Sequence, residues 1–149
     1  MGPDFRKVES SYVSVGFVAG LPSLHRAALG TVALASTEDL LPLWPGESHA
    51  ALLARIASPE AVLKLAEPKS IVHFKGASAE VAADPVTRPV VDTTAAGDSF
   101  AAAYIAARLD GADPVAAARA GHRLAGVVVC YPGAIIPREA MPAPAKAAP

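Results

Sequence analysis

The stretch Val91-Asp92-Thr93-Thr94-Ala95-Ala96-Gly97-Asp98-Ser99-Phe100 decides how this chain is interpreted. It joins a turn of small residues to a predicted helix with a carboxylate, Asp98, in its first turn. The backbone amides of Ala95, Ala96 and Gly97 are helix-start donors without intrahelical partners, and the helix dipole adds partial positive charge there. Asp98 is expected about one turn from a phosphate held by these amides, where it can accept a proton from an attacking hydroxyl. The pattern indicates phosphoryl transfer.

A structural role accounts for the same residues when each is considered alone. Thr94 can cap the helix, and Asp98 can complement its dipole, as such residues commonly do. The functional interpretation therefore depends on what surrounds the stretch.

A second motif follows the first along the chain. It consists of Arg119-Ala120-Gly121-His122 and then the run from Tyr131 to Pro142, with Gly133 near its start. Together the two motifs resemble those of the ribokinase-like (PfkB) carbohydrate kinases, with Ala95-Ala96 where many members have Gly-Ala. The run after Tyr131 is similar to the tail of the members that act on 2-keto-3-deoxygluconate. The resemblance is strong from about Val90 to Pro142 and weak before Ser70.

This resemblance implies an α/β fold, a ribokinase-like layered α/β/α arrangement with a mainly parallel sheet. It also implies ATP-dependent phosphorylation of a sugar acid, with Mg²⁺ and a possible K⁺ as cofactors. A kinase for another sugar, of the ribose or fructose type, and a catalytically silent nucleotide-binding fragment are the alternatives.

The resemblance also suggests roles for individual residues. Asp98 would be the base, and Ala95, Ala96 and Gly97 would form the anion hole. The residues that would line the nucleotide site or hold a monovalent cation are, for the nucleotide, Lys75, Gly76, His122 and Gly133, and for the cation, Asp92 and Thr94.

Each of these assignments has a simpler alternative in the sequence itself. His122 lies on an apolar helical stripe, where a hydrogen-bonded structural histidine is the ordinary case. Lys75-Gly76 reads equally as a strand end followed by a turn, and Thr94 as a turn residue. Glu38 and Asp39 occupy the place of a family motif that acts through water on magnesium, but acidic residues also stabilise a helix start.

Composition excludes several classes of partner. The 149 residues are 52% hydrophobic and 18% charged, with a net charge of −1, so neither nucleic acid nor a membrane surface is indicated. Cys130 is the only cysteine, which excludes an intrachain disulfide and fits a cytoplasmic protein.

Periodicity and turn residues predict alternating strands and helices. The strands are expected at Tyr12–Ala19, Thr31–Ala35, Ser70–Lys75 and Ala79–Ala83, and the helices at Ser23–Leu29, from Ser36, at Ser48–Ala57, at Pro59–Glu67, after the signature to Leu109, and from Pro114 with Asp113 as cap.

The chain is expected to be the C-terminal half of such a kinase. We divide it into residues 1–30 without assignment, 31–141 as the ATP-binding and catalytic part, and 142–149 as a disordered Pro/Ala tail. Nothing before Gly30 resembles the family's acceptor site, so slow or absent turnover is expected from the chain alone. Self-association, or a separately encoded N-terminal half, would cover the exposed apolar side.

Overall fold

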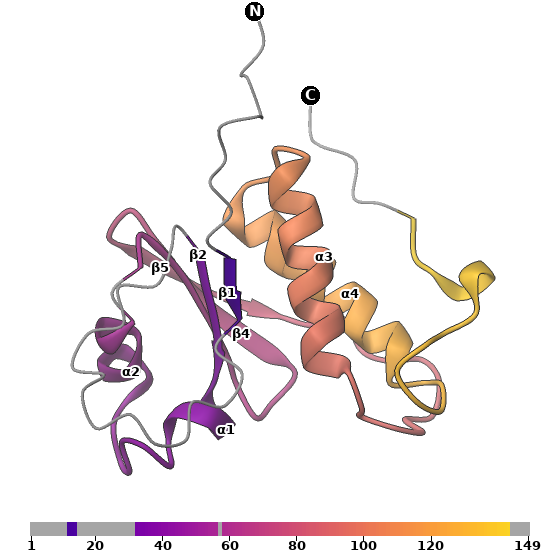
Figure 1. The fold of residues 1–149 in the computed structure, drawn as a ribbon, viewed down its shortest axis with the longest axis horizontal. Helices are drawn as coiled ribbons and strands as arrows, with labels where there is room; N and C mark the ends of the chain where they lie inside the picture. The colour runs from indigo at the N-terminus through magenta and orange to yellow at the C-terminus, as the bar shows by residue number, and fades with distance from the viewer. Residues whose placement is uncertain (1–11, 15–31, 57, 144–149) are drawn as a thin grey trace, which may run out of the picture.

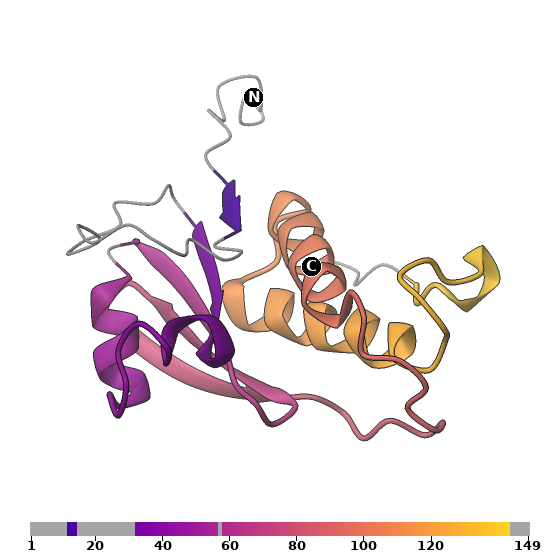
Figure 2. The same ribbon diagram turned by 60° about the horizontal axis from the view of Figure 1, so that its bottom comes forward.

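The computed structural model describes residues 12–14, 32–56 and 58–143, and they form a five-stranded sheet with helices on both faces. In Figures 1 and 2, α1 and α2 lie on one side of the sheet and α3 and α4 on the other. The strands are β1 (Tyr12–Ser14), β2 (Val32–Ser36), β3 (Glu60–Lys64), β4 (Lys69–Phe74) and β5 (Ala77–Ala82); the helices are α1 (Thr37–Leu40), α2 (His49–Arg55), α3 (Ala96–Leu109) and α4 (Pro114–Val128), followed by a 3-10 turn at Arg138–Ala140.

The sheet is mixed, and its strands follow one another in sequence order. β1 pairs with β2 and β2 with β3 in parallel, whereas β3 with β4 and β4 with β5 are antiparallel. The parallel pair β2 and β3 needs a crossover, which α1 and α2 provide, while the short turns after β3 and β4 permit only antiparallel neighbours. The expected layered α/β fold is confirmed, with an antiparallel half that the expectation of a mainly parallel sheet did not include.

Most of the predicted elements are present. The strands expected at Thr31–Ala35, Ser70–Lys75 and Ala79–Ala83 correspond to β2, β4 and β5, and both helices after the signature are found. Of the strand expected at Tyr12–Ala19, the structure describes Tyr12–Ser14, which form β1, and the helix expected at Ser23–Leu29 lies outside the described residues.

The helix predicted at Pro59–Glu67 is wrong, because this segment contains β3. Glu60 to Leu63 are all buried, as expected for a strand between β2 and β4 that is covered on both faces. A short apolar run of this kind has no period that separates a strand from a buried helix.

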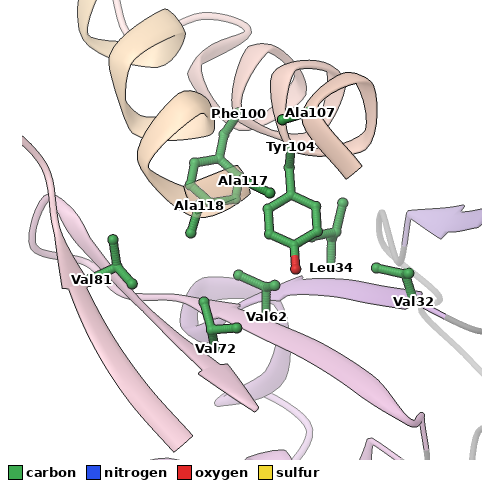
Figure 3. Close-up of a cluster of buried hydrophobic side chains, with 10 residues drawn as sticks. All are labelled: Val32, Leu34, Val62, Val72, Val81, Phe100, Tyr104, Ala107, Ala117 and Ala118. Carbon is green, nitrogen blue, oxygen red and sulfur yellow. The ribbon is translucent and has the colours of Figure 1, made fainter. Parts of the chain in front are cut away.

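Two apolar clusters hold the layers together, one on each face of the sheet. Alternate residues of β3 point to opposite faces, so that Val62 joins the α3 and α4 side while Ala61 and Leu63 join the α1 and α2 side. Figure 3 shows the first cluster, in which Phe100 and Tyr104 face the strands. Its buried members are Val32, Leu34, Val62, Val72, Val81, Phe100, Tyr104, Ala107, Ala117 and Ala118.

α3 and α4 approach each other closely where Gly121 meets Phe100. A Cβ atom on Gly121 would lie 2.8 Å from Cδ2 of the Phe100 ring, so a larger residue would force the helices apart. The start of α4 is fixed as predicted: Pro114 takes the first turn, and Oδ1 of Asp113 accepts the Val115 and Ala116 amides at 2.9 Å each.

A buried carboxylate ties β3 to the end of α3. Glu60 is 2% exposed and accepts three hydrogen bonds. The Tyr104 hydroxyl donates to Oε1 at 2.5 Å, and Arg108 donates from Nε to Oε1 at 2.9 Å and from Nη2 to Oε2 at 2.8 Å. Because every donor comes from α3, this network sets where the helix lies along the sheet.

None of the helices built from the described residues is both long enough and apolar enough to cross a membrane.

Candidate active site

The loop before α3 is held in one conformation by Asp92. Oδ1 of Asp92 accepts the Thr94 amide at 2.8 Å, and Oδ2 accepts the Gly133 amide at 2.8 Å. Hydrogen bonds from the Thr94 side chain, and then from the two amides, hold the pKa of Asp92 below its usual range. The structure therefore brings Asp92, Thr94 and Gly133 together.

Helix α3 begins directly after this loop. Ala95 precedes its first turn with φ of 60° and ψ of 12°, the left-handed region, and makes no side-chain cap. Thr94 therefore does not cap the helix. The Ala96 amide donates to the Thr93 carbonyl at 3.2 Å, which leaves Gly97 and Asp98 as the next first-turn positions. Asp98 is exposed beside this helix start, consistent with a group that acts on a bound substrate.

The start of α3 opens onto a groove with a volume of about 660 Å³. The groove lies at the carboxyl ends of β2 and β3, the usual place for a ligand in a layered α/β fold. In Figure 1, α1 and the beginning of α3 lie at this same end of the sheet. The residues that line the groove include Ser36 at the end of β2, Glu38 and Asp39 from α1, Lys64 to Lys69 from the end of β3 to the start of β4, Ala96, Gly97 and Phe100 from α3, and His122, Ala125, Gly126 and Val129 from α4 and the residue after it.

Lys64 is a site residue that the sequence analysis missed. It is the last residue of β3, and its Nζ lies 3.1 Å from the position that a Cβ on Gly97 would occupy. The ammonium group thus stands against the first turn of α3, where it would add a full positive charge to that of the helix dipole. Once Glu60–Lys64 is assigned as a strand, a lysine at its carboxyl end is the signal that would have identified it.

Glu38 and Asp39 line the groove near the acidic start of α1. The Ser36 hydroxyl donates to Oδ2 of Asp39 at 2.6 Å, and the Asp39 amide returns a hydrogen bond to that hydroxyl at 3.2 Å. The Asp39 carboxylate is therefore held through Oδ2, and no described residue makes a hydrogen bond to its Oδ1. Carboxylate oxygens of this kind are ligands that suit a magnesium ion that carries several waters.

His122 reaches the groove from α4, but its contacts are those of a structural residue. Its Nε2 lies 3.0 Å from the Ser70 hydroxyl, and its ring meets the Phe100 ring edge-on. Burial lowers the pKa of His122, and a hydrogen bond with the Val81 backbone partly opposes this effect. A neutral imidazole that borders the groove can still contact a nucleotide.

Lys75 and Gly76 lie away from all of these residues. They form the two-residue turn between β4 and β5, with φ values of 50° and 79°. Positive φ at both positions is typical of a type I′ hairpin turn. Phe74 pairs with Glu60 at the start of β3, whereas Lys64 is at the end of β3, so the turn lies at the opposite end of the strands from the groove. The placement of Lys75 and Gly76 at the nucleotide site is therefore not supported.

A scan against family models matches residues 27–141 to the pfkB family carbohydrate kinases. A 2-dehydro-3-deoxygluconokinase of Escherichia coli strain K12 is 40% identical over 117 residues, which cover 75% of this chain and 38% of that protein. A 2-dehydro-3-deoxygluconokinase of Dickeya dadantii is 49% identical over 86 residues, or 56% of this chain and 28% of that protein. The chain thus spans well under half the length of the curated relatives it matches.

A solved structure with a similar fold contains ligands. It is an Escherichia coli protein described as a ribokinase II, in complex with ATP and Mg²⁺. The two chains have a TM-score of 0.60 and 25% sequence identity, and the match covers 71% of this chain and 35% of that one.

Proposed function

Because this chain belongs to the pfkB family of carbohydrate kinases, we propose that it forms the ATP-binding and catalytic part of a sugar-acid kinase. The phosphoryl acceptor would be a hydroxyl of 2-dehydro-3-deoxygluconate, also called 2-keto-3-deoxygluconate. The observation that carries this proposal is the meeting of Lys64 with the first turn of α3 at the head of the groove.

The residues that line the groove, and Ala95 and Asp98 beside it, would have separate roles. The Ala95 and Gly97 amides at the start of α3 and the Lys64 ammonium would hold the transferred phosphoryl group and stabilise the charge that spreads over its oxygens, whereas the Ala96 amide donates to the Thr93 carbonyl. Asp98, one position further along, would accept the proton of the sugar hydroxyl as it attacks.

Asp39, with Glu38 beside it, would face the magnesium ion that accompanies ATP, and that ion would neutralise charge on the phosphates. His122 would border the nucleoside. A potassium ion near Asp92 and Thr94 stays a prediction of the sequence, and its test is a comparison of nucleotide affinity in KCl and NaCl.

Calorimetry with Mg²⁺ and ATP tests the nucleotide part of this proposal on the chain as it stands. We expect weak, magnesium-dependent binding that Lys64→Met weakens about tenfold or more, since a charge-assisted contact to phosphate is lost. Lys75→Met is the matched control, because it makes the same chemical change at the opposite end of the strands from the groove. Equal effects of the two substitutions, or no binding at millimolar ATP, would contradict the assignment of the groove.

The acceptor is tested separately. ADP formation is measured with 2-keto-3-deoxygluconate, ribose and fructose as acceptors, for this chain alone and with the N-terminal part of a relative added. Activity with the sugar acid that appears only when the N-terminal part is added supports the proposal. A preference for ribose or fructose would favour another kinase of the family.

A further inference from the structure

Asp92 connects two loops that are far apart in the sequence. It accepts the Thr94 amide through Oδ1 and the Gly133 amide through Oδ2, each at 2.8 Å. Both bonds point to backbone groups, so they fix the path of the chain rather than a single side chain. We call this pair of hydrogen bonds the Asp92 bracket.

The residue after the bracketed amide has an unusual conformation. Ala95 has φ of 60°, and among the described residues only Lys75 is another non-glycine with positive φ. A left-handed alanine is disfavoured because its Cβ crowds the following carbonyl. The Ser99 amide donates to the Ala95 carbonyl at 2.9 Å, so α3 begins at this strained residue. The direction of the first-turn amides therefore depends on Ala95 staying left-handed.

We propose that Asp92 is a positioning residue: its bracket holds Ala95 left-handed and so fixes the phosphate-binding amides of α3 before the nucleotide arrives. This inference rests on the proposed function in that the anion is taken to be a nucleotide phosphate. Two amides and the Thr94 hydroxyl occupy three of about four lone-pair sites of the carboxylate, so one site is left for the cation predicted near Asp92.

The hydrogen bonds of the Asp92 bracket offset the free-energy cost of the left-handed conformation of Ala95. Alanine restricts the loop to fewer conformations than glycine, which favours binding once the bracket has selected the left-handed one. Asparagine at position 92 offers one oxygen and an NH₂ group, and the NH₂ group cannot accept an amide hydrogen. Asp92→Asn therefore breaks one arm of the bracket and allows Ala95 to relax.

A double-mutant cycle separates this role from others. Mg²⁺-ATP affinity is measured for the natural chain, Asp92→Asn, Ala95→Gly and the double variant, with Asp84→Asn as a control for loss of one carboxylate. We expect Asp92→Asn to weaken binding roughly five- to thirtyfold, the factor that corresponds to the cost of a left-handed alanine. Ala95→Gly, which keeps the backbone amide, should restore most of that affinity in the Asp92→Asn background. An equal loss at position 92 in both backgrounds overturns the proposal.

A second measurement needs no nucleotide. Amide hydrogen exchange by NMR should show that Asp92→Asn reduces protection at Thr94 or Gly133 but leaves Val115, at the capped start of α4, unchanged. Unchanged protection at both amides refutes the bracket. Failure of the natural chain to bind ATP would remove the proposed function while leaving this readout decisive. If the loss of affinity occurs in KCl but not in NaCl, and glycine does not restore it, Asp92 acts as a cation ligand and the positioning role is rejected.

Discussion

Replacing Arg108 with methionine would leave the buried Glu60 carboxylate without its charged partner. Arg108 supplies two of the three hydrogen bonds to Glu60, at 2.9 and 2.8 Å, and Glu60 is 2% exposed. Breaking a buried ion pair from one side commonly costs about 3 to 5 kcal/mol, because the remaining charge is left uncompensated. Domains of this size unfold with about 5 to 15 kcal/mol, so Arg108→Met should remove a large share of the stability.

Urea unfolding followed by circular dichroism and by the fluorescence of the single tryptophan, Trp44, measures this change. Tyr104→Phe removes one donor only and should cost about 1.5 to 3 kcal/mol, the usual contribution of a hydrogen bond to a charged group. The double variant Glu60→Leu with Arg108→Met should recover much of the loss, since no buried charge remains.

The exposed pair between Lys69 and Glu80 provides the control. Its atoms are 3.4 Å apart at the surface, so Glu80→Gln should leave the urea midpoint nearly unchanged. If Arg108→Met lowers the midpoint no more than Glu80→Gln does, the Glu60 network does not contribute to stability in the way described.

Three further predictions concern pH, catalysis and association. Burial, and then the hydrogen bond to Glu60, raises the pKa of Tyr104 well above 10.0. The contribution of Tyr104 to stability is therefore present below pH 10 and is lost as the pH rises above it. The difference in unfolding free energy between the natural chain and Tyr104→Phe should shrink above pH 10. In an active assembly with an acceptor-binding part, Asp98→Asn should lower kcat by about 10² to 10⁴ with nearly unchanged ATP affinity, and near-normal turnover would place the base elsewhere. Light scattering over a dilution series should detect self-association through exposed apolar side chains such as Val90, Val91 and Ile135, whereas a monodisperse monomer would contradict it.

Elements that are bounded by capping or turn residues were predictable from the sequence. Asp113 and Pro114 start α4 as expected, and Gly76 turns the chain between two strands. The helix predicted at Pro59–Glu67 was wrong because such residues are missing there. Glu60 to Lys64 contain no glycine and no alternating pattern, and only pairing with strands on both sides makes them β3.

The resemblance suggested Lys75 and Gly76 for the nucleotide site, whereas the structure puts them at the opposite end of the strands from the groove. The directions of the amides that donate to Asp92 were not predictable from the sequence. Contacts made across 41 residues, such as the one from Gly133 to Asp92, depend on tertiary packing that no local pattern records.

The two halves of the sheet differ in how far along the chain their partners lie. β3, β4 and β5 are consecutive and joined by short turns, so their contacts close small loops, whose entropic cost is low. β2 meets β3 only after the chain has passed through α1 and α2, and contacts of that kind form more slowly. During folding, the antiparallel half of the sheet, which contributes Lys64 to the groove, is therefore expected to assemble first. The parallel half, which brings Asp39 to the same groove, should join it afterwards.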